Sequence, residues 1–296
     1  MSTQITTSFV EQYSANVQAL VQQRGSKLRG LVLSEPIRGK TAFFDQIGSV
    51  AAVKKTSRHA DTPQMNTPHA RRRLTTDTYN WSDLIDNDDK IKMLTDPASE
   101  YAQAAAWAMG RAIDEVIIDG ALGAADTGEN GTIPVKLPDS QKVVHGSTGM
   151  SLDKLSETKR LMDESDCPAE DRYIVLTAKQ MQDMLKSEKM TSADYASVKA
   201  LIRGEITEFM GFKFVQVNGK RGDNSLIVPA FKDSTKTIRK CLAFQKNGIR
   251  LGIGQDPFGK ITERDDKCFA TQVYYEMTIG ATRMQEELVV EVQCQE

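Results

Sequence analysis

PASEYAQAAAWAMGRAIDEVIIDGALG (97–123) is the stretch that decides the fold, because it reads as one uninterrupted helix about 39 Å long. Asp96 suits the N-cap, Pro97 suits the first helical position, and Gly123 ends the helix. One apolar face contains Ala105, Ala108, Met109, Ala112, Ile113, Val116 and Ile117. The opposite, polar face is predicted to contain Glu100, Arg111, Asp114, Glu115 and Asp119. The pattern therefore predicts a long amphipathic spine helix over 97–122.

Residues 1–33, which precede this helix at a distance, are rich in Gln, Ser and Thr and predict an arm with one helix. Residues 34–76 instead alternate in short pieces, such as KTAFFDQIG (40–48) and VAAVKKTS (50–57), and indicate an extended β-hairpin. Two strands of about 18 residues would reach about 60 Å, whereas a compact domain of this length has a radius of gyration of about 19 Å. An isolated hairpin is marginally stable in water, so this extended loop needs another surface, most simply a neighbouring subunit.

The residues after the spine helix alternate between helix and strand signals. Residues 124–150 are punctuated by Gly and Pro and favour a loop or a hairpin, and Ser151 can cap a helix that continues to about Ser165. The further expected elements are a buried strand at 173–176, a helix at 178–189, a strand at 212–217 after Gly211, strand-like segments at 225–231 and 240–254, and two final strands around Gly280. This succession predicts an α+β protein.

Charge is distributed unevenly along the 296 residues, although the formal net charge is only -2. Residues 1–73 contain eleven Lys and Arg against four Asp and Glu, a net charge of +7 that leaves -9 for the rest. A basic arm and an acidic body can attract each other between copies of one chain, and the arm can also touch DNA. The candidate intersubunit contacts are Arg38, Lys40, Lys54, Lys55, Arg58, Arg71, Arg72, Arg73, Asp83, Asp86, Asp88 and Asp89. For the three consecutive arginines, an acidic neighbour, DNA and plain solvation all stay open.

Motifs that carry enzyme chemistry do not occur in the sequence. It contains no phosphate-binding loop, no dinucleotide glycine motif, no H-E-x-x-H and no G-x-S-x-G. Cys167 precedes Pro168 without a base nearby and is expected to be a buried turn cysteine. The four scattered cysteines suit reduced thiols, and no apolar run reaches the roughly 18 residues of a membrane span. We therefore expect no catalytic residue, no cofactor, no metal site and no membrane association in a soluble protein made in the cytoplasm.

The order of these parts resembles a known family. RGKTAFFDQIG (38–48), the spine helix, CPAEDRYIVLTAKQMQDMLK (167–186) and GEITEFMGFKFVQVN (204–218) together resemble the major capsid proteins of tailed double-stranded-DNA bacteriophages, particularly short-tailed phages. The resemblance covers nearly the whole chain and implies the Hong Kong 97-like capsid fold. It divides the chain into an N-terminal arm (1–33), an extended loop (34–76), a peripheral domain (77–150), an axial domain (151–262) and C-terminal strands returning to the peripheral domain (263–296).

The resemblance also implies a function. Capsid subunits of this family form pentamers and hexamers of an icosahedral shell around double-stranded DNA, in which each extended loop lies over an adjacent subunit. The implied location is the virion, after assembly in the host bacterial cytoplasm. The expected partners are other copies of the chain, a portal protein, packaged DNA without sequence specificity and a decoration protein. A separate scaffolding protein is expected because only about 33 residues precede the loop. Alternatives are an encapsulin-like compartment shell, an enzyme with a non-obvious site, and a tail or decoration protein.

Overall fold

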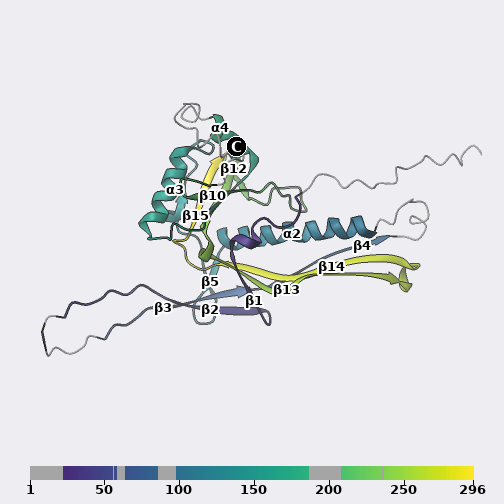
Figure 1. The fold of residues 1–296 in the computed structure, drawn as a ribbon, viewed down its shortest axis with the longest axis horizontal. Coiled ribbons are helices and arrows are strands. Elements are labelled where there is room, and N and C mark those ends of the chain that lie inside the picture. Colours follow the sequence, from purple (N-terminus) through teal and green to yellow (C-terminus); the bar gives the residue numbers. More distant parts are fainter. Residues whose placement is uncertain (1–22, 56, 59–63, 86–97, 187–207, 235–236) are drawn as a thin grey trace, which may run out of the picture.

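The computed structural model describes residues 23–55, 57–58, 64–85, 98–186, 208–234 and 237–296, which form three β-sheets and three α-helices (Figure 1). The arm residues 1–22, the proposed N-cap Asp96 with Pro97, and residues 187–207 lie outside these ranges. The sheets and helices divide into a long peripheral part, a compact axial part and a small sheet from which the extended loop projects.

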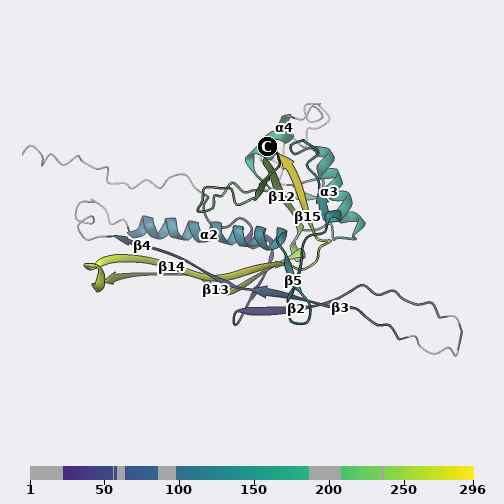
Figure 2. The same ribbon diagram turned by 180° about the vertical axis from the view of Figure 1, so that it is seen from behind.

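The peripheral part consists of one long helix beside a long antiparallel hairpin. Helix α2 (Ala98–Leu122) lies along strands β13 (Ile249–Arg264) and β14 (Ala270–Arg283) in both views (Figures 1 and 2). The sheet order is β1-β13-β14-β4, with β1 at Leu33–Pro36 and β4 at Asp77–Ile85. Met109, Ile113 and Ile117 of α2 are buried in the same apolar cluster as Met277 and Ile279 of β14. The helical period thus located this helix correctly.

Asp114 differs from its predicted place on the polar face, because its side chain is fully buried. Its Oδ1 accepts hydrogen bonds from the Ser26 hydroxyl at 2.6 Å and from the two following backbone amides at 3.0 Å. One turn earlier, a Cβ on Gly110 would lie 2.4 Å from the carbonyl carbon of Gly25. Residues 23–28 therefore form a strap across the helix, and this strap supplies the hydrogen bonds that a buried carboxylate requires.

The axial part is a seven-stranded sheet covered by two helices. Its order is β7-β15-β12-β8-β10-β9, and β11 pairs with β12. Helix α3 (Leu152–Glu164) begins as predicted, since Ser151 Oγ accepts a hydrogen bond from the Lys154 amide. Its apolar side chains share one cluster with those of α4 (Ala178–Lys186) and of strand β8 (Arg172–Leu176).

The other strands of the axial sheet are β7 (Lys142–Val143), β9 (Glu208–Phe209), β10 (Phe212–Gln216), β11 (Ala230–Lys232), β12 (Thr237–Gln245) and β15 (Val289–Gln295). The 3-10 helices are η2 (Arg29–Leu31), η3 (Asp139–Gln141), η5 (Lys246–Gly248) and η6 (Asp265–Lys267).

The extended loop begins in a third, antiparallel sheet of order β2-β3-β5-β6. These strands are β2 (Thr41–Ile47), β3 (His69–Thr75), β5 (Ala125–Thr127) and β6 (Ile133–Val135). The β2–β3 ladder continues to a last bond from the Gly48 amide to the Pro68 carbonyl at 2.8 Å. Beyond it, residues 49–55 are not a strand, so the prediction for VAAVKKTS is wrong. Pro68 has no N–H with which to continue the ladder.

Three strands lie in other sheets than those in which the domain boundaries implied by the resemblance place them. β1, placed in the extended loop, pairs in parallel with β13 of the peripheral sheet. β13, placed almost wholly in the axial domain, forms the long hairpin with β14. The last strand, β15, pairs with β12 of the axial sheet and does not return to the peripheral sheet. The segment at 225–231 becomes a strand only from Ala230, after Pro229.

Gly280 does not separate two strands but lies inside β14, opposite Gly252 of β13. A Cβ on Gly280 would lie 2.1 Å from the carbonyl oxygen of Thr75, and a Cβ on Gly252 would lie 2.1 Å from Ile37 Cδ1. The glycine pair thus allows the chain at the base of the extended loop to cross the long hairpin in close contact.

Candidate intersubunit contact surface

The base of the extended loop is attached to its own subunit through one face of β2. Burial alternates along this strand, with Phe44 and Gln46 partly buried and Phe43, Asp45 and Ile47 exposed. The Arg250 guanidinium lies 4.8 Å from the ring centroid of Phe44, an arrangement that favours a cation–π contact. The outward face of β2 therefore exposes both apolar and charged side chains.

Beyond Gly48 and Pro68 the loop exposes apolar and basic side chains together. Val50 and Val53 are 59% and 60% exposed, and Met65 is 48% exposed. The predicted contacts Lys54, Lys55 and Arg58 are exposed on the same segment. Apolar side chains on a projecting segment are unfavourable in water unless another surface covers them. The segment thus has the mixed composition of a protein–protein interface.

The three consecutive arginines are each paired within the chain. Because side chains alternate along a strand, Arg71 and Arg73 lie on one face of β3 and Arg72 lies on the other. The partners of Arg71, Arg72 and Arg73 are Asp45 at 2.6 Å, Glu286 at 2.5 Å and Asp126 at 2.6 Å, respectively. The hydrogen bond from Arg71 holds the pKa of Asp45 below its ordinary value.

Arg72 is consequently removed from the candidate intersubunit contacts. Only 8% of its side chain is exposed, and its guanidinium points toward Glu286 in the interior of its own subunit. Because side chains alternate along a strand, the middle arginine of three must point to the opposite face from the other two. The presence of three consecutive arginines does not by itself indicate this difference. Arg71 and Arg73 are partly exposed, so both remain candidates.

The remaining candidates lie at the base of the loop and on β4. Arg38 and Lys40 are exposed between β1 and β2, and Asp83 is exposed on β4. Asp83 accepts a hydrogen bond from the backbone amide of the next residue. Asp86, Asp88 and Asp89 lie outside the described residues. The structure thus leaves β4 with one of the four acidic candidates.

An acidic excess lies on β4 and along the long hairpin, up to the far end of the hairpin. Residues 77–85 and 254–278 contain seven Asp and Glu against three Lys and Arg. The extended loop and this hairpin end point in opposite directions from the middle of the subunit (Figures 1 and 2). The subunit therefore has a basic end and an acidic end, which suits contact from one copy to the next.

Exposed apolar residues at the hairpin end were missed by sequence reasoning. Phe258, Ile261 and Phe269 are between 52% and 61% exposed on or beside β13 and β14. The only sequence signal is the interruption of apolar alternation by charged residues in GKITERDDKCFA (259–270). These side chains add an apolar component to the acidic end of the subunit.

Chemically reactive groups are few in the described part of the chain. Cys167 is 6% exposed, as expected of a turn cysteine, and its burial raises the pKa of its thiol although Arg172 lowers it. Among the described residues, no group of three or more His, Cys, Asp or Glu is arranged to hold a metal ion. No helix in these residues is long and apolar enough to cross a membrane.

Comparison with known proteins identifies the fold. A capsid structure of the cyanophage P-SCSP1u has a TM-score of 0.70 and 16% identity, covering 97% of this chain and 93% of that chain. A structure from Mycobacterium phage Che8 has a TM-score of 0.66 and 17% identity over 95% and 96% of the two chains. A capsid structure of the cyanophage Pam1 has a TM-score of 0.68 and 12% identity over 98% and 97%. No curated protein sequence matches this chain significantly. The chain thus has the Hong Kong 97-type capsid fold.

The sequence itself narrows this class to a family. The profile of the phage capsid protein family matches residues 5–296, and the chain therefore belongs to that family. It is a structural protein of the virion, and family and fold together support a major capsid subunit. The encapsulin-like alternative is not favoured.

Proposed function

We propose that this capsid subunit assembles into pentamers and hexamers of an icosahedral head that encloses double-stranded DNA. The observation that supports the proposal best is the extended loop, whose outer part exposes Val50, Val53 and Met65 together with basic side chains. Such a segment is only marginally stable alone and needs another surface to cover it. In a symmetric shell, every subunit has a neighbouring subunit that can provide this surface.

The contact from one subunit to the next is electrostatic in part. Lys54, Lys55 and Arg58 lie on the loop, and the acidic excess lies at the opposite end of the molecule. Each exposed ion pair contributes about 0 to 1 kcal/mol. A closed shell repeats each contact in every subunit, so small contributions are sufficient for assembly.

The proposed function also involves partners other than the chain itself. We propose a separate scaffolding protein and a portal protein during assembly in the host bacterial cytoplasm, packaged DNA held without sequence specificity, and a decoration protein on the finished shell. In each of these interactions this chain acts as a structural component of the shell and not as an enzyme.

Expression of the full chain with its scaffolding protein tests the proposal. We expect uniform hollow particles in negative-stain electron micrographs and a single fast-sedimenting boundary in analytical ultracentrifugation. Expression of the chain without the scaffolding protein is the control for spontaneous aggregation. Monomers or irregular aggregates under all salt conditions would contradict a shell-forming role.

Reversal of the loop charge is expected to weaken assembly. The variant Lys54→Glu, Lys55→Glu and Arg58→Glu should fold normally, because all three side chains are exposed. Loss of up to three pairs of about 0 to 1 kcal/mol each should raise the concentration at which shells form by up to about a hundredfold. Light scattering against subunit concentration measures this threshold.

A matched control changes the same charge elsewhere. Lys136→Glu, Lys220→Glu and Lys232→Glu also alters three exposed lysines, and it should leave the threshold close to that of the wild type. Raising the ionic strength should reduce the difference between loop variant and wild type, since salt screens exposed charges. Equal thresholds for both variants and the wild type would contradict the electrostatic contribution.

A further inference from the structure

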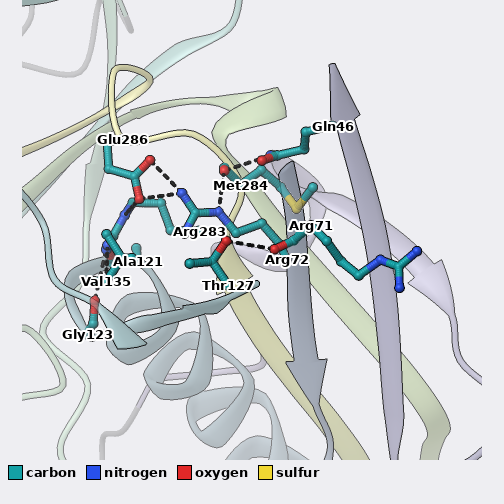
Figure 3. A network of polar contacts seen from close by, with 10 residues as sticks. All are labelled: Gln46, Arg71, Arg72, Ala121, Gly123, Thr127, Val135, Arg283, Met284 and Glu286. Atoms are coloured by element: carbon teal, nitrogen blue, oxygen red, sulfur yellow. Dashed lines mark hydrogen bonds and ion pairs between the residues drawn. The ribbon is translucent and has the colours of Figure 1, made fainter. Parts of the chain in front are cut away.

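The extended loop is joined to the rest of the subunit by a buried cluster of two arginines and one glutamate. Arg72 comes from β3, Arg283 is the last residue of β14, and Glu286 lies in the connection from β14 to β15 (Figure 3). The cluster therefore lies where the loop sheet, the peripheral sheet and the axial sheet meet.

Arg283 attaches the peripheral sheet to the end of the spine helix. Its side chain is fully buried, and its Nη1 donates to the carbonyl oxygens of Ala121 at 2.6 Å and Gly123 at 2.9 Å. Its Nη2 donates to the carbonyl oxygen of Val135 on β6 at 3.0 Å. A cation at the C-terminal end of a helix satisfies free carbonyls and interacts favourably with the helix dipole.

Arg72 attaches the extended loop to the same place. Its Nη2 lies 2.5 and 2.6 Å from the two carboxylate oxygens of Glu286, and its Nε donates to the Met284 carbonyl at 3.1 Å. Gln46 of the partner strand β2 donates to that carbonyl at 2.7 Å (Figure 3). Both strands of the loop base are thus fixed to the connection between β14 and β15.

Glu286 is the counter-ion that the two guanidinium groups share. Its carboxylate bonds Arg72 and lies 3.7 Å from Nε of Arg283, while only 16% of its side chain is exposed. Among the described residues, Nη1 of Arg72 and Nε of Arg283 are buried without a hydrogen-bond partner. Loss of the carboxylate would leave two buried positive charges beside each other, which is strongly unfavourable.

Besides this cluster, the loop base crosses the long hairpin at Gly252 and Gly280, and its strand pairing with β5 is short. Strand β3 pairs with β5 only at Arg72↔Thr127 and Arg73↔Asp126. From Thr41 to Lys55 an extended chain spans up to about 46 Å, so a rotation of about 5° at the base would move Lys55 by up to about 4 Å. A displacement of that size exceeds the length of a hydrogen bond.

We propose that the Arg72–Glu286–Arg283 cluster is a positioning device that fixes the direction of the extended loop and thereby the angle at which neighbouring subunits meet. The proposal rests on the proposed shell-forming function. According to the proposal, these residues determine the geometry of assembly. This role is additional to the effect that any buried network of ion pairs has on the stability of the fold.

The variant Glu286→Gln tests this role, since it keeps the shape of the side chain and removes its charge. We expect the subunit to stay folded by circular dichroism, while amides of residues 41–47 and 69–75 exchange with deuterium about tenfold faster. Co-expressed with the scaffolding protein, it should form particles of irregular curvature or variable diameter. Glu286→Asp, which keeps the carboxylate, should restore wild-type particles in part.

The control is Glu164→Gln, which breaks an exposed pair with Arg160 on α3 and should alter neither exchange nor particle diameter. If Glu286→Gln does not fold, Arg72→Gln asks the same question, because it leaves Arg283 and Glu286 as a neutral pair. Uniform wild-type particles from a folded variant would overturn the proposal. Unfolding of both variants would also overturn it, by assigning the cluster to stability alone. A wild type that forms no shells would instead refute the proposed function.

Discussion

A subunit in which residues 49–67 are replaced by Asn-Gly is expected to fold and to form no closed shells. Asn-Gly suits the two-residue turn that would join Gly48 to Pro68, where the β2–β3 ladder already ends. Loss of about 3 kcal/mol at each intersubunit contact would lower each association constant by a factor of about 150. Electron microscopy and sedimentation should therefore show monomers or small oligomers under conditions where the wild type forms shells.

The truncated subunit should be at least as stable as the wild type. Within the replaced segment, the described residues are exposed except Thr67, and none belongs to a buried apolar cluster. Shortening a connection of about 20 residues to two lowers the entropy cost of closing it by up to about 2 kcal/mol. A thermal midpoint far below that of the wild type would contradict this independence of the loop.

A control variant separates the length of the loop from its chemistry. It replaces residues 49–55 with a Gly-Ser sequence of equal length, which keeps the reach of the loop and removes the side chains of Val50, Val53, Lys54 and Lys55. We expect this variant to assemble poorly, although better than the truncated subunit. Wild-type shells from the truncated subunit would refute the role of the loop in assembly.

Periodicity made part of the fold predictable. The spine helix, helix α3 and the base of the extended loop each repeat an apolar pattern over several helical turns or strand residue pairs. Residues that are close in sequence therefore determine the secondary structure of these segments. Asp114 was not predictable in this way. Its buried carboxylate depends on Ser26, which is 88 residues away, and only tertiary structure brings that partner to the helix.

The same limit applies to the candidate contact surface. The basic loop could be located because its lysines and arginines are close in sequence, but the pairing of Arg72 depends on Glu286, 214 residues later. Strand membership is equally non-local. β4 contains the candidate contact Asp83, and its register with β14 is set by residues about 200 positions away. Charge pattern therefore indicates the kind of surface, and sheet topology decides which charges remain available.

The substitution Gly280→Ala is expected to disrupt the crossing of the loop base over the long hairpin. The added Cβ would lie 2.1 Å from the carbonyl oxygen of Thr75 and 2.9 Å from its carbonyl carbon. Both are backbone atoms, and they cannot turn away as a side chain can. We expect a loss of about 3 kcal/mol or more, seen as a thermal midpoint lower by about 5 °C or more, and no closed shells.

Two other glycines make this prediction specific. Gly252→Ala meets only the ends of side chains, with Ile37 Cδ1 at 2.1 Å and Leu74 Cδ2 at 2.8 Å, so its cost should be smaller and Ile37→Val should reduce it further. Gly222→Ala meets nothing within 4 Å and should have almost no effect on the melting temperature. Differential scanning calorimetry should therefore rank the losses in the order 280, 252, 222. A Gly280→Ala subunit that melts with the wild type would show that the backbone at Thr75 can move aside, and the close crossing would then not constrain the loop.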